Sequence, residues 1–121
     1  MQQIRNLISD RGSRYAVSFG AVSSASDIAA FLKELKSASK FAKATHNSWA
    51  VLLKDGGARK DDDGEGGAGA AILRMLEREE LYDRIIVVTR WYGGVHLGGD
   101  RFRHVTTATR AALEAMRAEK A

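Results

Sequence analysis

The sequence predicts an α+β fold in which two or three helices pack on one small β-sheet as a two-layer α/β sandwich. Three short runs rich in apolar and β-branched residues, as strands require, occupy residues 14–22, 47–55 and 84–89. A segment with helical periodicity follows each of these runs along the chain. Because 121 residues are enough for one self-sufficient core, residues 1–121 are expected to form a single domain.

The N-terminal third of the chain supplies the first strand and the first helix. The strand is expected at residues 14–22, and residues 1–13 leave room for an extra edge strand or hairpin. The helix is expected within residues 23–38, with Ser24 or Ser26 as its N-cap. Its apolar face is formed by Ile28, Phe31, Leu32 and Leu35.

Two further helices are expected after a polar segment. Glycine and aspartate dominate residues 55–67, which are expected to lie on the surface and to be mobile in the middle. The next helix is expected from Ala68, with a buried stripe of Ile72, Leu73, Met75 and Leu76. The last helix is expected at residues 100–118, with Asp100 as its N-cap. Its buried side is expected to hold Phe102, Val105, Thr109, Ala112, Leu113 and Met116.

The composition excludes several kinds of site. The chain has no cysteine, which rules out disulfides, thiolate metal sites and a cysteine nucleophile. No apolar run approaches the length of a membrane span, and the first residues are too polar for a signal peptide, so a cytoplasmic protein without membrane contact is expected. Because neither a phosphate-binding nor a dinucleotide-binding motif is present, no cofactor is expected.

The formal net charge of +4 is unevenly distributed along the chain. Residues 1–60 carry ten Lys or Arg and four Asp or Glu, residues 61–80 carry two and seven, and residues 81–121 carry seven and four. Such separation can create basic and acidic surface regions that steer partners of either sign. The alternative is that these charges only solvate the outer faces of the fold.

A glycine-rich segment, TRWYGGVHLGGDRF at residues 89–102, joins the last strand to the last helix. Free backbone N–H groups at the helix start can hold an anion, assisted by Arg90, Arg101 and Arg103. The Asp100 carboxylate argues against a phosphate there, since as an N-cap it occupies the same donors. A structural turn, a contact surface for protein or RNA, and a catalytic loop are the three interpretations of this segment.

Trp91 and Tyr92 are neighbours in this segment, so in an extended strand they point to opposite faces and only one can enter the core. The other is expected to be exposed beside Arg90, a composition typical of an interaction hot spot. A partly covered aromatic residue in a satellite core is the alternative.

The acidic run DDDGE at residues 61–65 offers four carboxylates, which suggests a divalent cation. Its spacing does not follow the calcium-loop pattern, and no histidine lies nearby in the sequence. Helix-end electrostatics also explain the run, with Asp62 or Asp63 as N-cap and Glu65 in the first helical turn. No metal site is therefore assigned.

Lys40, Lys43 and His46 recur at steps of three. On a helical turn these residues would align on one side as a small basic patch, with Phe41 turned inward. Weak, salt-sensitive contact with RNA phosphates is one interpretation of this patch, and a solvated helix edge is the other.

A catalytic centre is not indicated by any nucleophile next to a base at a recognisable spacing. His96 and His104 lie in and just after the glycine-rich segment, and folding could bring them together, so an enzyme is the alternative to a binding protein. The sequence favours a non-enzymatic protein without catalytic residues.

The chain carries three longer motifs, KFAKATHNSWA at residues 40–50, DDGE at 62–65 and VVTRWYGGVHLGGDRF at 87–102. These motifs resemble those of the Impact family, which includes the bacterial YigZ-type proteins. With SDRGSRY at residues 9–15, the resemblance covers nearly the whole chain. GGDRFRHV at residues 98–105 is similar to the eukaryotic branch of the family, although Gly99 stands where that branch commonly has proline. Gly66 stands where the family usually has threonine or proline.

The resemblance implies a fold like the second domain of ribosomal protein S5. It also implies a non-enzymatic regulator of translation, because eukaryotic Impact-type proteins restrain the amino-acid-starvation kinase of the general control pathway by competing for the ribosome-associated scaffold that activates it. Actin and the ribosome are further partners implied by the family, and an RNA- or ribosome-binding module is the alternative function. Neither the RWD domain of eukaryotic relatives nor the small C-terminal domain of bacterial ones is expected within residues 1–121.

The expected contact residues fall into two sets. Those assigned to partner binding, which belong to the glycine-rich segment and the acidic motif, are Arg90, Trp91, Tyr92, Gly93, Gly94, Leu97, Gly98, Asp100, Arg101, Asp62, Asp63, Gly64 and Glu65. The candidate RNA or anion contacts are Lys40, Lys43, His46 and Arg103.

Overall fold

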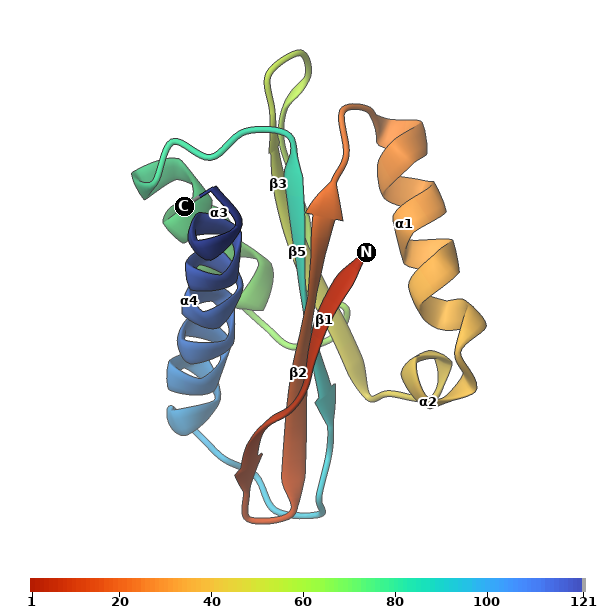
Figure 1. Ribbon diagram of the computed structural model, residues 1–121. Coiled ribbons are helices and arrows are strands. Elements are labelled where there is room, and N and C mark those ends of the chain that lie inside the picture. Colours follow the sequence, from red (N-terminus) through yellow and green to blue (C-terminus); the bar gives the residue numbers. More distant parts are fainter. Residues whose placement is uncertain (121) are drawn as a thin grey trace.

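The computed structural model describes residues 1–120, which form a five-stranded antiparallel sheet flanked by helices (Figure 1). The strands are β1 (Gln2–Asp10), β2 (Ser13–Ala21), β3 (His46–Leu53), β4 (Gly57–Asp61) and β5 (Arg84–Trp91). The helices are α1 (Ala25–Ser37), α2 (Ser39–Ala42), α3 (Ala68–Arg78) and α4 (Asp100–Lys120). The strand order is β1-β2-β5-β3-β4, so the last strand in the sequence lies at the centre. The expected α+β class is confirmed.

Helices cover both faces of the sheet, so the fold has three layers rather than the two expected (Figure 1). Along β5, Ile86 and Val88 pack toward α3 and α4, whereas Ile85 and Val87 pack toward α1 and α2. A helical stripe in a sequence shows that one side of a helix is buried, but not which face of the sheet buries it. The unbroken apolar run of β5 is what a strand covered on both faces requires.

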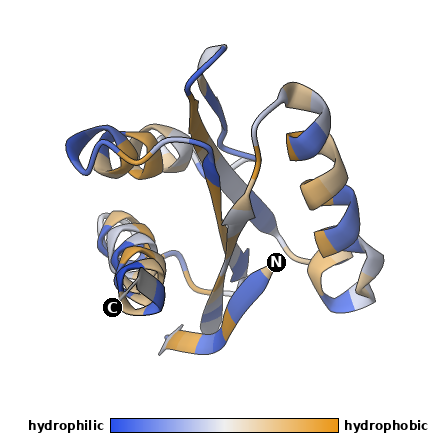
Figure 2. Cartoon of the chain, turned by 45° about the horizontal axis from the view of Figure 1, so that its top comes forward, coloured by the Kyte–Doolittle hydropathy of each residue, from blue (hydrophilic) through white to orange (hydrophobic). Residues whose placement is uncertain are grey.

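The apolar sides of the helices face the sheet, and their polar sides face outward (Figure 2). In α1, Ile28, Phe31 and Leu35 are buried as expected. Ser24 is the N-cap of α1, because its extended backbone lets its Oγ accept a hydrogen bond from the backbone N–H of Asp27, at 3.1 Å. Within residues 1–120, none of the helices combines the length and the apolar character that crossing a bilayer requires.

The N-terminal residues form the edge strand anticipated at residues 1–13, since β1 pairs with β2. Residues 57–61 are exposed, as expected for a surface segment, but no strand was expected there. These residues form β4, which pairs with β3 at the opposite edge of the sheet and has five exposed residues. The sequence reasoning missed β4 because an exposed edge strand needs no apolar alternation.

The last helix begins at Asp100 as expected, but Phe102 is not on its buried side. The Phe102 side chain is 38% exposed and lies against Gly67, just before α3. The remaining members of the expected stripe, Val105, Thr109, Ala112, Leu113 and Met116, are buried. Because Phe102 sits in the first turn of α4, it extends beyond the core toward the loop before α3. In α3, Ile72 and Leu76 are buried, whereas Leu73 and Met75 are only partly buried.

Candidate functional site

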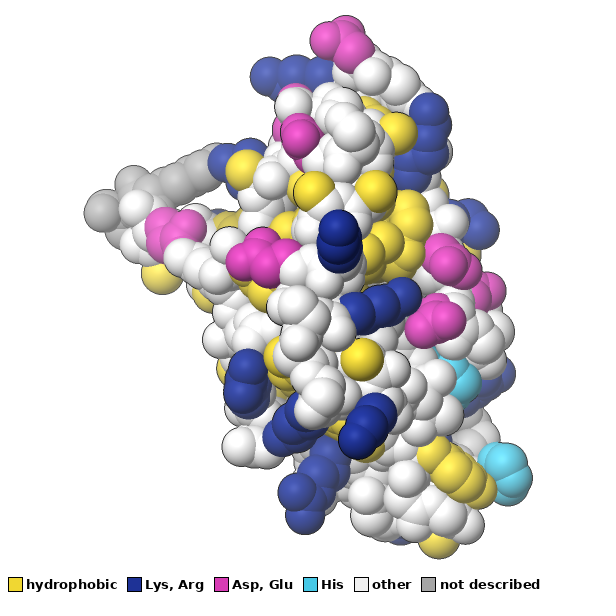
Figure 3. Space-filling model, turned by 90° about the vertical axis from the view of Figure 1, so that its right-hand side faces the viewer, with side chains coloured by type: hydrophobic (Ala, Val, Ile, Leu, Met, Phe, Trp, Pro, Cys, Tyr) yellow, Lys and Arg dark blue, Asp and Glu magenta, His cyan; other side chains and the backbone are white. Residues whose placement is uncertain are grey.

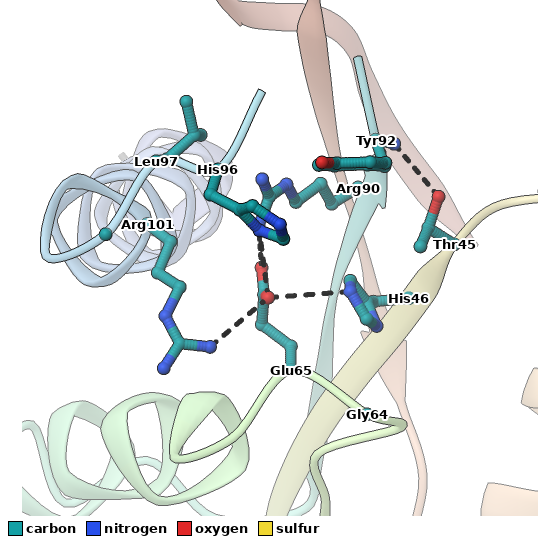
Figure 4. Close-up of a pocket in the computed structure, with 10 residues that line it drawn as sticks. Thr45, His46, Gly64, Glu65, Arg90, Tyr92, His96, Leu97 and Arg101 are labelled. Carbon is teal, nitrogen blue, oxygen red and sulfur yellow. Dashed lines mark hydrogen bonds and ion pairs between the residues drawn. The ribbon is translucent and has the colours of Figure 1, made fainter. Parts of the chain in front are cut away.

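The end of β5 meets the loop before α3 and the start of α4 at a polar pocket of about 510 Å³. We call it the Glu65 pocket; it is lined by Thr45, His46, Gly64, Glu65, Arg90, Tyr92, His96, Leu97, Gly98 and Arg101 (Figure 4). Seven of these ten residues belong to the set assigned to partner binding from the sequence. Folding thus brings the acidic motif and the glycine-rich segment to one place.

Glu65 lies at the centre of the pocket with two guanidiniums and one imidazole around its carboxylate (Figure 4). Nη1 of Arg90 lies 3.1 Å from each carboxylate oxygen, so it donates to both. Nε2 of His46 lies 3.5 Å from Oε2, and Nη1 of Arg101 lies 3.6 Å from the same oxygen. Glu65 is only 4% exposed, and a buried carboxylate needs such partners to remain charged.

Arg90 is the buried cation of the pocket, at 5% exposure. Its Nη2 donates to Oγ of Ser13 at 3.3 Å, while its Nε has no hydrogen-bond partner within residues 1–120. The guanidinium lies between the rings of Tyr15 and Tyr92, 5.8 and 5.7 Å from their centroids. Burial raises the pKa of Tyr15 to about 12, so its phenol stays neutral beside this charge.

His46 belongs to the pocket and not to a basic helix edge. The alignment expected for Lys40, Lys43 and His46 is wrong, because α2 ends at Ala42 and His46 starts β3. Nδ1 of His46 lies 2.8 Å from the backbone oxygen of Asp63, which directs Nε2 toward Glu65. The seven residues 40–46 therefore span two elements, and a helical spacing rule does not apply to them.

Asp62 and Asp63 hold the loop that delivers Glu65. The Asp62 carboxylate accepts hydrogen bonds from the backbone N–H groups of Gly67, at 3.0 Å, and Gly69, at 2.7 Å. These bonds lower the pKa of Asp62 and satisfy backbone donors at the start of α3, whose N-cap residue is Gly67 rather than the expected Asp62 or Asp63. Oδ2 of Asp63 accepts from the backbone N–H of Asn47 at 2.7 Å.

Glu65 is not in the first turn of a helix, because α3 begins at Ala68. The sequence reasoning placed this carboxylate at a helix end, whereas its partner is a guanidinium from the central strand. Within residues 1–120, no three His, Asp or Glu side chains gather in a way that could hold a metal ion.

The turn after β5 is held against the β1–β2 hairpin. The backbone N–H of Gly93 donates to Oγ of Ser13 at 3.2 Å, and that of Tyr92 donates to Oγ1 of Thr45 at 2.9 Å. A Cβ on Gly93 would lie 2.0 Å from the carbonyl carbon of Gly12, so only glycine allows this close approach. The β1–β2 hairpin and Thr45, just before β3, thereby fix the position of the turn.

Trp91 and Tyr92 point to opposite sides, as expected for neighbours at the end of a strand. The Trp91 ring packs edge-on to Phe41, 5.2 Å between centroids, and its Nε1 donates to the backbone oxygen of Lys40 at 2.9 Å. Tyr92 is exposed and its ring lies 5.5 Å from that of His96. The exposed aromatic residue beside Arg90 is therefore Tyr92.

A second polar cluster joins the start of α4 to the β1–β2 hairpin. The Asp100 carboxylate contacts the guanidiniums of Arg11 and Arg103, which lower its pKa. Nε2 of His104 lies 2.7 Å from Oδ2 of Asp10. His104 therefore contacts Asp10 in this cluster, whereas His96 lines the Glu65 pocket beside Tyr92.

Apolar side chains are exposed around the Glu65 pocket. Tyr92, Val95 and Phe102 are 43%, 46% and 38% exposed, and they come from the pocket wall, the turn and the first turn of α4. Sequence reasoning missed Val95 and assigned Phe102 to the core. No signal in the sequence marked the exposure of Val95, since Leu97 lies between the same two glycine pairs and is buried.

Comparison with known proteins identifies the family. The family model described as the Impact N-terminal domain matches residues 11–113. The chain belongs to the Impact family. The resemblance seen in the three motifs is thereby confirmed.

The relatives extend beyond the region shared with this chain. The protein IMPACT homolog of Saccharomyces cerevisiae is 38% identical over 112 residues, which cover 88% of this chain and 43% of the yeast protein. The solved structure of the two-domain translational regulator Yih1 is 38% identical, with a TM-score of 0.56 over 89% of this chain and 44% of that one. The chain thus spans less than half the length of these relatives.

A further solved structure supports the fold alone. It is the crystal structure of a hypothetical protein, with a TM-score of 0.78, 23% sequence identity, and coverage of 93% of this chain and 57% of that one. The two proteins therefore share a fold.

Proposed function

We propose that this Impact-family chain is a non-enzymatic regulator of translation that acts by binding another protein through the surface around the Glu65 pocket. The description of Yih1 as a translational regulator supports the process. The observation that carries the proposed surface is the group of exposed apolar side chains, Tyr92, Val95 and Phe102, next to a pocket with buried charges. Protein interfaces typically combine aromatic residues and arginine in this way.

The rigidity of this surface supports a binding role. Hydrogen bonds from Tyr92 and Gly93 fix the turn to Thr45 and Ser13, and the Arg90–Glu65 pair fixes the wall of the pocket. A surface that is already ordered loses less conformational entropy when a partner binds. The exposed aromatic ring of Tyr92 can therefore contribute its contact area at low entropic cost.

The partners in this proposal follow from the family. We expect the chain to act in the cytoplasm in the general amino acid control pathway, where it would restrain the starvation-activated kinase or compete for its ribosome-associated scaffold. Actin and the ribosome are further candidate partners. Because the chain spans less than half of its relatives, the whole pathway role belongs to the proposal rather than to the family assignment.

The test is affinity capture of partners from the native cytosol, with mass spectrometry to identify them. Tyr92→Ala combined with Phe102→Ala should abolish capture of proteins of the translation machinery or the starvation pathway. Tyr82→Ala is a matched control, since Tyr82 is also 43% exposed but lies between α3 and β5. If the double variant remains folded and captures the same partners as Tyr82→Ala, this surface is not the binding site.

The non-enzymatic part of the proposal has its own test. A screen of small phosphorylated and nucleotide substrates should show no turnover by the wild-type chain. Turnover that His96→Ala abolishes would contradict a purely binding role, because His96 lines the pocket and is exposed.

A second candidate function, RNA or ribosome binding, is favoured by a basic patch around α2. Arg5 and Lys40 lie 5.2 Å from the ring centroids of Phe41 and Trp91, respectively. Arg14 pairs with Trp91 across the β2–β5 ladder, which places both side chains on this face of the sheet. Figure 3 shows Lys and Arg gathered in the lower half of the α1 side of the molecule. We call the basic residues Arg5, Arg14, Lys40 and Lys43 together the α2 patch.

The α2 patch can be tested with a single-stranded homopolymer RNA. If it binds phosphates, affinity should fall with salt, and Lys40→Glu with Lys43→Glu should flatten the salt dependence by about 0.7 in logarithmic slope for each lost contact. Lys54→Glu, in the exposed β3–β4 turn, is the control. Absence of RNA binding even at low salt would exclude this second candidate.

A further inference from the structure

The Glu65 pocket carries more positive than negative charge. Among its ten lining residues, Arg90 and Arg101 are permanently charged cations, His46 and His96 add two imidazoles, and Glu65 is the single carboxylate. Nη1 of Arg90 lies 3.1 Å from Oε1 of Glu65, so the Glu65 carboxylate balances the charge of Arg90. One guanidinium charge in the pocket, that of Arg101, is therefore left without a carboxylate of its own.

Arg101 is placed to receive an external anion. Its Nη1 lies 3.6 Å from Oε2 of Glu65, which is longer than a hydrogen bond, and its side chain is 32% exposed. Figure 4 shows it reaching from α4 toward the Glu65 carboxylate, across the pocket from His46. A guanidinium has five N–H donors, so Arg101 can hold an incoming carboxylate while Glu65 keeps Arg90.

The surroundings of Arg101 favour a single anion over a polyanion. The neighbouring arginines beyond the pocket are already neutralised, since Arg103 and Arg11 both contact Asp100 and Arg11 also contacts Asp10. A nucleic acid backbone needs a track of unpaired cations, whereas the arginines described beside the pocket, Arg11 and Arg103, are paired with carboxylates. Apolar side chains, Tyr92, Val95 and Phe102, are exposed there instead.

We propose that the Glu65 pocket binds the carboxylate of a glutamate or aspartate side chain from the partner protein. This inference rests on the proposed function and specifies the chemistry of the partner at that site. Arg101 pairs with the carboxylate, and the imidazoles of His46 and His96 line the same space. The exposed apolar side chains contact the partner residues on either side of its acidic residue. The recognised segment therefore carries an acidic residue with apolar neighbours.

The experiment uses terminally blocked tripeptides as probes, one of sequence Leu-Glu-Phe and one of sequence Leu-Gln-Phe. Both are titrated into the ¹⁵N-labelled full chain, and the amide resonances of Thr45, Gly64 and Gly98 are followed. The glutamate peptide should shift these resonances, and the glutamine peptide should not. Arg101→Gln should weaken binding about tenfold, the effect expected for loss of one charge-assisted hydrogen bond. Arg110→Gln, an exposed arginine of the same helix, should leave it unchanged.

Three results would overturn the carboxylate site. One is equal shifts with both peptides or no shifts up to the solubility limit of the glutamate peptide. Another is equal affinity in the Arg101→Gln and Arg110→Gln proteins. The third is inorganic phosphate shifting these resonances when the glutamate peptide does not, which would indicate a phosphate site. Partner capture that Tyr92→Ala with Phe102→Ala abolishes but Arg101→Gln retains would leave the proposed function standing and exclude the carboxylate site.

Discussion

Arg90 and Glu65, separated by 25 residues in the sequence, form a buried ion pair in which one Nη1 lies 3.1 Å from both carboxylate oxygens. Arg90 comes from the end of the central strand, and Glu65 comes from the loop before α3. The pair therefore ties the glycine-rich segment to the acidic motif. Its partners on either side, Ser13 and His46, connect the β1–β2 hairpin and β3 to the same point.

Removing the carboxylate of this pair should strongly destabilise the fold. Glu65→Gln leaves the buried Arg90 guanidinium without its anion, and breaking such a pair typically costs about 3–5 kcal/mol. The free energy of unfolding, measured by urea titration, should fall by that amount. Glu77→Gln, an exposed position in α3, should change it by less than about 0.5 kcal/mol.

A double substitution separates the loss of the pair from the loss of Glu65 itself. Glu65→Leu with Arg90→Met removes both charges, and its unfolding free energy should lie above that of either single variant. If the loss of unfolding free energy in the double variant equals the sum of the losses in Glu65→Leu and Arg90→Met, the two side chains contribute independently.

Asp62 should stabilise α3 through its two backbone hydrogen bonds. Asp62→Ala leaves the N–H groups of Gly67 and Gly69 without this acceptor, which should cost about 1–2 kcal/mol. Asp55→Ala, in the exposed β3–β4 turn, should be nearly neutral. Hydrogen exchange should localise the effect, with faster exchange in the first turn of α3 than in α4.

Acid should destabilise the protein through carboxylates whose pKa values are depressed in the folded state. Hydrogen bonds from Arg11 and then His104 lower the pKa of Asp10 from 3.8 to about 2, and those from Gly67 and Gly69 lower the pKa of Asp62. Both contributions are present above the unfolded pKa near 3.8 and are lost as pH falls through the lower folded values. Unfolding free energy should therefore decline between about pH 4 and pH 2.

The Asp10 part of this pH dependence can be isolated. Asp10→Asn removes the titrating group, so the decline of stability below pH 4 should be shallower in this variant than in the wild type. An unchanged slope would mean that the contacts of Asp10 with Arg11 and His104 do not differ between the folded and unfolded states.

Gly93→Ala should be among the most damaging single substitutions. The added Cβ would lie 2.0 Å from the carbonyl carbon and 2.4 Å from the oxygen of Gly12, and both are backbone atoms that cannot turn away. A loss of at least about 3 kcal/mol is expected from this overlap. Gly94→Ala meets open space and costs only its positive φ of 90°, about 1 kcal/mol. Urea unfolding of the two variants measures these losses of unfolding free energy. Equal losses would contradict this ordering.

The main elements of the fold could be predicted from local sequence. Periodicity located α1, α3 and α4, and apolar runs located β2, β3 and β5, because burial on one side of a helix or within a strand leaves a repeating pattern. The edge strand β4 left no such pattern, since its residues are exposed. Its identity depends on backbone pairing with β3, which a pattern of side chains does not encode.

Of the ten residues that line the Glu65 pocket, the sequence pointed to seven as partner contacts, but it did not give their arrangement. Arg90 and Glu65 were both assigned to partner binding, yet the sequence placed Glu65 in a helical turn and did not pair it with Arg90. His46 was expected beside Lys40 and Lys43, and Phe102 in the core. Each of these differences arises from contacts between segments that are distant in the chain.

By itself, the sequence determined the type of the main helices and strands and the family of this protein, because apolar spacing, turn residues and motif order are local properties of the chain. Only the tertiary structure decided that helices cover both faces of the sheet, that Glu65 and Arg90 form a buried pair, and that Tyr92 is exposed while Trp91 is partly buried. The physical reason is that burial and ion pairing depend on which segments meet in space, and the order of strands in the sheet sets those meetings.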